Sequence, residues 1–552
     1  GISPFSAPSW EMSLKRRAIG VGTAMIRLQS RRHQSSMILK TINGVSAPLP
    51  RAVDKSPSGA LAPHKLKELT FEENITLRKK HLAPSLRAHY ANSKSGPLKL
   101  VSGAGQYLFD NNRRRYLDCV NNVCHVGHTH PRVVQAAAAQ LSILNTNSRY
   151  LHDNIVRLAQ GLADRMPDPL QSVFFVNSGT EANDLALRLA RNYTGRQDVY
   201  CVDGAYHGHS ASTLAISPYS KYSSVEMPAG AVKLTQPDVY RLGGTESSVT
   251  ASSLAEYAAL LSAGNQMPAA FIVESLMCCG GMVKLPEGYL RGMYELTRSH
   301  GGLTIADEVQ TGFGRIGTHF WAFEPHGVVP DIVTVGKPFG NGFPLAAVVT
   351  TREVSEASNN FEYFNTFGGN PVACAVGLEV LAVIDDEKLQ QNALETGQYV
   401  CELLKQVQQR QERVGDVRCS GLMMGVELVL DPVTKTPDAE GAAYVMARMK
   451  DAGVLVSTDG PLRNVLKMKP PICFASEDAS TLANVMDAAL SELPPLQRQL
   501  KVQNLNNTAD ASQPDAFEAV AAMLVRHGTS ELSARGTCPA QSAVSEMIRR
   551  QR

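Results

Sequence analysis

Long apolar runs are missing from this sequence of 552 residues, and no segment has the length of a membrane-spanning helix. A strong charge of one sign is missing as well, because 54 Lys and Arg against 51 Asp and Glu leave a net charge of only +3. So small a charge gives no reason to expect a nucleic-acid partner. We therefore expect neither a membrane segment nor nucleic-acid binding. The length favours two or three domains with a large apolar core.

Paired cysteine motifs are also absent. The 10 cysteines are scattered beside apolar runs, and none has Cys-x-x-Cys spacing. This distribution is typical of free, buried thiols in a reducing compartment rather than a disulfide framework. The stretch Cys124-His125-Val-Gly-His128-Thr-His130 has residue types that bind metals. Its close spacing and the following Pro131 suit a loop before a helix at least as well, and we predict no metal site.

Acidic residues are missing between Glu11 and Asp54, a span that carries basic residues such as Arg16, Arg31 and Lys40. An arginine-rich, serine-containing, acid-free N-terminus is typical of a mitochondrial import signal. We therefore predict that residues 1–65 are a disordered targeting leader and that the protein is mitochondrial. A basic leader without that role, on a cytoplasmic protein, is the alternative. Residues 501–552 are polar and poor in aromatics, so we predict a mostly disordered tail.

Short apolar runs alternate with segments of helical periodicity over most of the chain. A hairpin is predicted over residues 107–118, where Asp110-Asn111-Asn112 supplies the turn. The patterns predict strands at 172–176, 198–202, 269–273, 303–306 and 332–335, and helices at 131–144 and 181–193. After about residue 385 they predict a charged helix at 388–409 and strands within 417–430, which indicates a smaller C-terminal domain.

Two of these runs end on residues that apolar sheets do not usually keep. Asp307 follows the run at 303–306, and Lys337 comes just after the run at 332–335. A single charged residue at a strand end is usually a solvated edge residue. In open α/β sheets, however, ligands bind just beyond the carboxyl ends of the strands. A carboxylate and an amine at that position suit pyridoxal phosphate, which needs an acidic partner for its ring nitrogen and a lysine for its aldehyde.

A turn of small residues follows the strand predicted at 172–176. Ser178, Gly179 and Thr180 come there and open the next helix. Backbone N–H groups, hydroxyls and the helix dipole make such a turn a ready phosphate cradle. Serine and threonine also cap ordinary helices, so this signal is weak when taken alone.

The longest signature in the chain joins these features. The segments Asp307-Glu-Val-Gln-Thr-Gly-Phe-Gly-Arg315 and Gly336-Lys-Pro-Phe-Gly-Asn-Gly-Phe-Pro344 together resemble the class III (ω-amino) aminotransferase signature. The resemblance covers about residues 77–493. It implies an α/β protein of pyridoxal-phosphate fold type I, with a mainly parallel seven-stranded sheet between helices and a smaller α/β domain. We accordingly expect an N-terminal segment at 66–115, a large domain at 116–385 and a small domain at 386–500.

The resemblance also implies roles for individual residues. Lys337 would bond the cofactor aldehyde and then act as the catalytic base, and Asp307 would hold the ring nitrogen protonated. The other residues expected to bind the cofactor are Ser178, Gly179, Thr180, Tyr206, His207, Glu274, Val309, Gln310 and Thr366. Tyr206 would stack on the ring. Thr366 would contact the cofactor phosphate of a partner subunit, which implies a homodimer or a tetramer.

Two positions depart from the aminotransferase pattern. Relatives that bind keto acids pair a glutamate with an arginine that receives the substrate carboxylate. In this chain Cys279 replaces that glutamate and Lys467 replaces that arginine. Both halves of the carboxylate-binding pair are therefore altered together.

These variants resemble the phospho-lyase branch of the family, which includes ethanolamine-phosphate and 5-phosphohydroxy-L-lysine phospho-lyases. The resemblance implies a small phosphorylated amine as substrate, released as an aldehyde, ammonia and phosphate. We expect Arg149, Cys279, Arg463 and Lys467 to face that substrate. The alternatives are an aminotransferase, either alanine–glyoxylate-like or acting on ω-amino acids, and a catalytically inactive scaffold that keeps the fold.

Overall fold

The computed structural model describes residues 68–91, 93, 95–219, 230–264 and 267–496. The predicted leader and the predicted tail both lie outside these residues. The chain divides after Lys80, and each part is described by itself. Helix α1 (Phe71–His81) lies in the first part except for its last residue, and it begins where Thr70 and Glu73 exchange hydrogen bonds of 2.8 and 3.1 Å. None of the helices in the described ranges is both long and apolar enough to cross a membrane.

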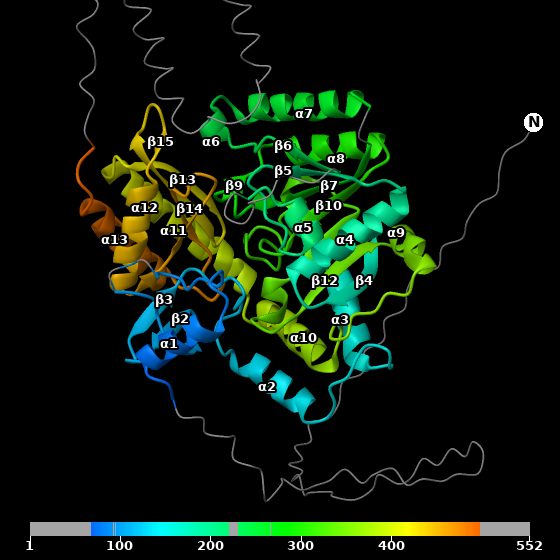
Figure 1. Cartoon of the computed structure of the whole chain (residues 1–552), viewed down its shortest axis with the longest axis horizontal. Helices are drawn as coiled ribbons and strands as arrows, with labels where there is room; N and C mark the ends of the chain where they lie inside the picture. The colour runs from blue at the N-terminus through cyan, green and yellow to red at the C-terminus, as the bar shows by residue number, and fades with distance from the viewer. Residues whose placement is uncertain (1–67, 92, 94, 220–229, 265–266, 497–552) are drawn as a thin grey trace, which may run out of the picture. The chain divides into compact units, whose positions relative to one another are not determined.

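The largest sheet of the second part has seven strands in the order β4-β12-β11-β10-β7-β5-β6 (Figure 1). Neighbouring strands pair in parallel except at β12, which runs antiparallel to β11 and β4. The mainly parallel sheet that the resemblance implied is therefore confirmed. In spatial order, the strands are β4 (Leu170–Val176), β12 (Ala346–Thr351), β11 (Ile332–Val335), β10 (Leu303–Asp307), β7 (Pro268–Glu274), β5 (Asp198–Val202) and β6 (Ala231–Leu234).

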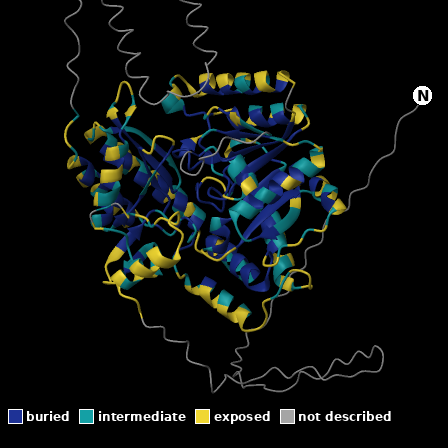
Figure 2. Ribbon diagram, viewed as in Figure 1, coloured by how far each residue is buried: buried dark blue, intermediate teal, exposed yellow. Residues whose placement is uncertain are grey.

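Apolar layers cover both faces of this sheet. Along β7, Ala270 and Ile272 pack in one cluster with residues of α4 (Gly179–Thr194). Phe271 and Val273 pack in another cluster, with residues of α8 (Tyr289–Ser299) and α10 (Pro371–Asp386). Strands β7, β10 and β11 are buried over their whole length, as Figure 2 shows in dark blue. Strands covered on both faces are held rigidly, which fixes where their ends lie.

The remaining elements up to α10 connect these strands or extend from the sheet. The helices are α2 (Pro131–Leu141), α3 (Asp153–Ala163), α5 (Ala211–Ala215), α6 (Val239–Leu242), α7 (Glu246–Ser262) and α9 (Arg352–Glu356). Short 3₁₀ turns occur at η1 (Glu324–His326), η2 (Lys337–Gly340) and η3 (Ala357–Asn360), and β8 (Leu276–Met277) pairs with β9 (Val283–Lys284).

The C-terminal part contains a second mixed set of helices and strands. Its elements are α11 (Leu389–Arg410), β13 (Val414–Ser420), β14 (Met423–Asp431), β15 (Thr436–Pro437), α12 (Ala439–Asp451), β16 (Val454–Leu455), β17 (Ser457–Asp459), β18 (Val465–Met468) and α13 (Ser476–Ser491). The hairpin of β2 (Tyr107–Asp110) and β3 (Arg115–Asp118) pairs with β1 (Leu100–Ala104) on one side and with β16 on the other. The N-terminal strands are thus joined to the C-terminal part.

The predicted elements agree closely with those in the structure. Strands β5 and β11 match their predicted ranges residue for residue. The hairpin at 107–118 and the strands within 417–430 are also confirmed. Helix α2 ends at Leu141, earlier than the predicted residue 144. Residue 385, the predicted end of the large domain, lies in the last turn of α10, and the domain boundaries implied by the resemblance stay predictions.

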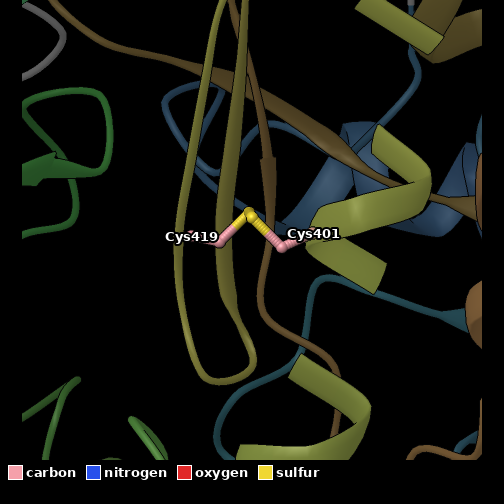
Figure 3. The surroundings of a disulfide bond; sticks show 2 residues. All are labelled: Cys401 and Cys419. Carbon is pink, nitrogen blue, oxygen red and sulfur yellow. A yellow bond between two sulfur atoms is a disulfide. The ribbon is translucent and has the colours of Figure 1, made fainter. Parts of the chain in front are cut away.

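The expectation that the cysteines remain free is wrong for one pair. Cys401 on α11 and Cys419 on β13 form a disulfide with their Cα atoms 6.0 Å apart (Figure 3). The sequence gives no sign of it, because the two residues meet only when α11 packs across β13. The other described cysteines are free: Cys119, Cys124, Cys201, Cys278, Cys279, Cys374 and Cys473.

Substitution of a glycine in α11 provides a test of how this helix packs against β13 and the turn that follows it. A Cβ atom added at Gly397 would lie 2.5 Å from the backbone carbon of Gly421, in the turn between β13 and β14. We expect Gly397→Ala to destabilise the protein by roughly 1–3 kcal/mol, because the backbone has to move. The matched control is Gly161→Ala in α3, where the nearest atom would be 3.6 Å away. That change should stabilise by up to about 1 kcal/mol through helix propensity. Shifts of the same sign in the two melting curves would contradict this account.

Candidate active site

The parallel strands deliver polar residues to one edge of the large sheet. Strand β10 ends at Asp307 and β7 ends at Glu274, and these two residues are paired in register. Lys337 follows β11 after Gly336, and Tyr206 comes shortly after β5. Because the carboxyl ends of parallel strands share one edge, residues far apart in the sequence meet there.

These strand ends surround a cavity of about 420 Å³, a size suited to a small molecule. The predicted cofactor residues that line it are Ser178, Gly179, Thr180, Tyr206, His207, Glu274, Asp307, Val309, Gln310 and Lys337. The structure thus brings together every residue predicted to bind the cofactor except Thr366.

Asp307 is held in the cavity wall by three hydrogen bonds. Its carboxylate is only 4% exposed. One oxygen, Oδ2, accepts hydrogen bonds from Nδ2 of Asn183 and Nδ1 of His207, both at 2.8 Å. The other oxygen accepts the backbone N–H of Val309 at 3.0 Å. These donors replace the water that a buried carboxylate loses, and they fix the direction in which it points.

Asn183 was not predicted as a site residue. It lies on the buried face of α4, where its Nδ2 also donates to the carbonyl of His207 at 2.7 Å. Its Oδ1 accepts from the hydroxyl of Thr334 at 2.7 Å. One feature of the sequence could have pointed to this residue. Asn183 is an amide among the small and apolar residues on the inner face of the helix, and a buried polar side chain is usually held by hydrogen bonds.

The N-terminus of α4 forms the other end of the cavity. Ser178 caps the helix, its hydroxyl accepting the backbone N–H of Glu181 at 3.2 Å. The hydroxyl of Thr180 accepts the N–H of His209 at 3.3 Å. At Gly179 a Cβ atom would lie 2.5 Å from Val309 Cγ1, so only glycine fits beside that side chain. Helix N–H groups and hydroxyls therefore converge on a space that is suited to an anion.

Lys337 enters the cavity from an unusual backbone conformation. Its φ angle is +23°, a region that non-glycine residues rarely adopt. The preceding Gly336 lies close to the start of α4, since a Cβ atom there would be 3.3 Å from the nitrogen of Gly179. Strained residues of this kind are concentrated at functional sites, because the surrounding structure must hold them in place.

Glu274 and Gln310 form a neighbouring hydrogen-bonded group. Glu274 accepts the N–H groups of Tyr206 at 3.3 Å and Cys278 at 3.2 Å, and the amide of Gln310 at 3.3 Å. Burial, together with the negative charge of Asp307, raises the pKa of Glu274.

The Gln310 amide also lies 3.6 Å from Cys279 Sγ. Burial raises the pKa of the Cys279 thiol, so this residue does not supply the negative charge of the glutamate it replaces.

Three of the predicted site residues are exposed and do not line the cavity. Thr366 is one of them. Arg149 stacks over the ring of Phe364 at 3.9 Å and lies 3.5 Å from Glu362. Arg463 is exposed in the turn between β17 and β18, with a φ angle of +56°. A single chain does not bring these residues to the cofactor cavity.

Lys467 is buried, but it also lies outside the cavity lining. From β18 its amine makes an ion pair with Asp459 on β17. Asp459 in turn accepts the hydroxyl of Tyr219. The charge of Lys467 is therefore already balanced within the chain.

Lys469 is a second buried lysine, and the sequence did not single it out. It is 7% exposed, and its Nζ lies 3.1 Å from Gln310 Oε1 and 3.4 Å from Asn122 Oδ1. Burial is the main cause that lowers the pKa of Lys469, to about 8. Gln310 lines the cavity, so this amine lies just behind the cavity wall.

The three histidines of the stretch 124–130, which was considered as a metal site, each bond a different group of the protein. The ring of His125 bonds the carbonyl of Phe313 at 2.8 Å and the guanidinium of Arg315 at 3.0 Å. His128 bonds Asp118 at 2.7 Å, and His130 bonds Glu387 at 3.0 Å. In the described ranges, no cluster of three or more His, Cys, Asp or Glu is arranged to hold a metal ion.

The residues of the cavity fit pyridoxal phosphate. Asp307 offers a fixed carboxylate for a protonated ring nitrogen, and Lys337 offers an amine for the aldehyde. The start of α4 offers a cradle for the phosphate, from which the crowding at Gly179 excludes any larger side chain. All three chemical requirements of the cofactor are therefore met within one cavity.

Asn183 provides a test of how Asp307 is held. We expect Asn183→Ala to raise the dissociation constant for pyridoxal phosphate roughly tenfold, because a charged hydrogen bond to Asp307 is lost. The matched control is Asn192→Ala on the same helix, whose amide bonds the carbonyl of Ala357 at 2.7 Å. Cofactor titration of both apoproteins provides the measurement. Equal affinities in the two variants would mean that Asn183 does not support the site.

Comparison with known proteins agrees with this geometry. The family model for aminotransferase class-III matches residues 90–490. The alanine–glyoxylate aminotransferase 2-like protein of Drosophila melanogaster is 48% identical, covering 75% of this chain and 85% of its own length. The mitochondrial alanine–glyoxylate aminotransferase 2 homolog 2 of Arabidopsis thaliana is 43% identical over 76% of this chain and 87% of its own.

Proteins with phospho-lyase names are also similar. Ethanolamine-phosphate phospho-lyase homolog 1 of Caenorhabditis elegans is 39% identical over 76% of this chain and 93% of its own length. Among solved structures, a phospholyase from Arthrobacter in complex with phosphoethanolamine is 38% identical with a TM-score of 0.73. That match covers 76% of this chain and 100% of the other. The chain belongs to the class III aminotransferase family, and pyridoxal phosphate is its cofactor.

Proposed function

We propose that this enzyme is a phospho-lyase that acts on a vicinal amino-phosphate ester, either O-phosphoethanolamine or 5-phosphohydroxy-L-lysine. The observation that carries the proposal is the loss of a carboxylate-binding pair. Cys279 is a buried neutral thiol, and Lys467 is already paired with Asp459. A keto acid would therefore lack the cation that receives its carboxylate in the aminotransferases. The similarity to a phospholyase bound to phosphoethanolamine supports the same substrate class.

The reaction balances with one molecule of water. O-phosphoethanolamine and water give acetaldehyde, ammonia and phosphate. The C–H bond beside the amine breaks, and the Nζ of Lys337 receives the proton. The C–O bond on the adjacent carbon then breaks, and phosphate leaves with the electron pair. The chemistry that bound pyridoxal phosphate supplies is withdrawal of electrons from the carbon that bears the amine.

The protein's own groups prepare these steps. The Asn183 amide and the His207 ring hold Asp307 in place, so that its charge is directed at a protonated ring nitrogen. The N-terminus of α4 would hold the cofactor phosphate, and Lys337 reaches the cavity from the neighbouring end of β11. Elimination leaves the cofactor in its original oxidation state, so no second substrate is needed to regenerate it.

An aminotransferase is the second candidate. The same lysine and carboxylate support proton removal in both reactions. Relatives at 48% and 43% identity are named after alanine–glyoxylate aminotransferase. The two candidates differ in whether a keto acid has to be present for continued turnover.

We infer that the active enzyme is a homodimer. Segments around Arg149 and Phe364 are joined by their cation–π contact, and Val372 N–H bonds Asn145 at 3.2 Å. The large apolar side chains exposed on these segments and on the ends of the adjoining α2 and α3 are Leu141, Ile143, Leu144, Tyr150, Leu151, Val156, Phe364 and Phe367. Exposed apolar groups in such number favour a protein interface. Thr366 lies among them and would contact the cofactor phosphate of a partner subunit.

We also infer that the protein is located in mitochondria. The acid-free N-terminal composition supports it, and so does the mitochondrial name of the Arabidopsis thaliana relative.

The lyase proposal is tested by following phosphate and ammonia during incubation with O-phosphoethanolamine or 5-phosphohydroxy-L-lysine. We expect both products to be released steadily with no keto acid added, because elimination does not consume the cofactor. The control is Lys337→Ala, which removes the base and should abolish release while cofactor binding is still detectable. Release that stops after one cofactor equivalent, and resumes on addition of glyoxylate or pyruvate, would establish the aminotransferase instead.

The dimer is tested by a change that should do no harm to a monomer. Leu151 is fully exposed within one chain, at 104% of the reference area. We expect Leu151→Asp to weaken association and to reduce activity in parallel, as measured by sedimentation across a range of protein concentrations. Val433→Asp is the matched control, since Val433 is 87% exposed in the turn between β14 and β15. An unchanged sedimentation profile for Leu151→Asp would count against an interface at this surface.

A further inference from the structure

Lys469 differs from the other buried lysines of the protein in what balances its charge. Within the described ranges, the lysines with buried side chains are Lys450, Lys467 and Lys469. Lys467 has Asp459 as its partner, and Lys450 lies 3.8 Å from Asp451. The amine of Lys469 has only the amide oxygens of Gln310 and Asn122, and no described carboxylate lies within ion-pair distance of it.

A buried ammonium without a carboxylate is costly, because neutral oxygens replace only part of the water it loses. The backbone nevertheless holds this residue firmly. Its N–H donates to the carbonyl of Cys119 at 2.7 Å, directly after the end of β18. A cation fixed in place at this cost suggests an anion that is not part of the chain.

The position of the Lys469 amine next to the cofactor cavity indicates where that anion would bind. Gln310, which accepts one hydrogen bond from Lys469, lines the cofactor cavity. Asn122, which accepts the other, immediately precedes Val123 in the same lining. The amine therefore contacts one residue of the cavity lining and the immediate neighbour of another. The cofactor phosphate has its own cradle at the start of α4, formed by Ser178, Gly179 and Thr180.

We propose that the Nζ of Lys469 binds the phosphate group of the substrate, with Gln310 and Asn122 holding the amine in place before the substrate enters. This inference rests on the proposed function and specifies how that function selects a phosphate monoester. A compact ammonium suits a phosphate dianion, whereas a carboxylate is best matched by the fork of an arginine. The sequence led us to expect that Lys467 and Arg463 face the substrate, whereas this proposal assigns the phosphate contact to Lys469.

Binding of inorganic phosphate to the holoenzyme is the direct test. The bound cofactor already occupies the cradle at α4, so added phosphate reports on a second anion site. We expect calorimetry to detect such binding in the wild-type holoenzyme and Lys469→Met to weaken it roughly 10- to 100-fold, as loss of a charged hydrogen bond predicts. Lys450→Met is the control, because it also removes a buried lysine but should leave phosphate affinity unchanged. Equal phosphate affinity in Lys469→Met and wild type, or no phosphate binding by the wild-type holoenzyme, would overturn the proposal.

A second variant keeps the lysine and so guards against misfolding of Lys469→Met. Asn122→Asp would place a carboxylate beside the amine, where Asn122 Oδ1 now lies 3.4 Å from Nζ. It should raise the melting temperature by pairing the buried cation, and it should weaken phosphate binding because the new carboxylate competes with the anion. Phosphate affinity that stays at the wild-type level in this variant would count against the proposal.

Turnover separates this inference from the proposed function. If the enzyme is a phospho-lyase, Lys469→Met should raise KM for O-phosphoethanolamine while leaving the affinity for unphosphorylated ethanolamine unchanged. A wild-type enzyme that binds phosphate through Lys469 but releases none from O-phosphoethanolamine would reject the lyase and retain the anion site. Steady phosphate release with the same KM in both proteins would reject the role of Lys469 and retain the lyase.

Discussion

Asp307 is a carboxylate placed at the end of a fully buried strand, and this placement constrains much of the large domain. A buried carboxylate is tolerated only where donors replace its lost water. Asn183 on α4 and His207 after β5 supply them, so a helix and two strands must keep one relative position. Thr334 on β11 fixes Asn183 in turn. The apolar layers on both faces of the sheet give this polar group the rigid support it needs.

The charges around the cavity follow from the same burial. Glu274 lies beside Asp307 in the sheet, and its raised pKa means that it holds a proton more readily than an exposed glutamate. Asp307 is the carboxylate whose oxygen accepts from Asn183 and His207, and it is the group suited to a protonated ring nitrogen. Lys469 is a further ionisable group buried beside the cavity, and burial is the main cause that lowers its pKa to about 8.

The short apolar runs in the sequence were sufficient to predict the strands and the residues that follow them. Lys337, Asp307 and the Ser178–Thr180 turn each lie beside a strand whose apolar run is visible in the sequence. Asn183 could not be assigned in this way, because its role depends on His207 and Thr334, which lie on other elements. The pairing of Lys467 with Asp459 likewise depends on β17 and β18 lying side by side. The Cys401–Cys419 bond requires α11 to cross β13.

The proposed contacts with phosphate divide between two regions, the start of α4 for the cofactor and Lys469 for the substrate. Among the described residues that line the cavity, Lys337 is the only Lys or Arg. Helix N–H groups and hydroxyls at α4, which carry no full charge, would therefore receive the cofactor phosphate. In the proposed reaction Lys337 would bond the aldehyde and take the substrate proton, so it would not be a permanent anion partner. A substrate phosphate would need a separate cation, and Lys469 is a lysine behind the cavity wall whose charge no described carboxylate balances.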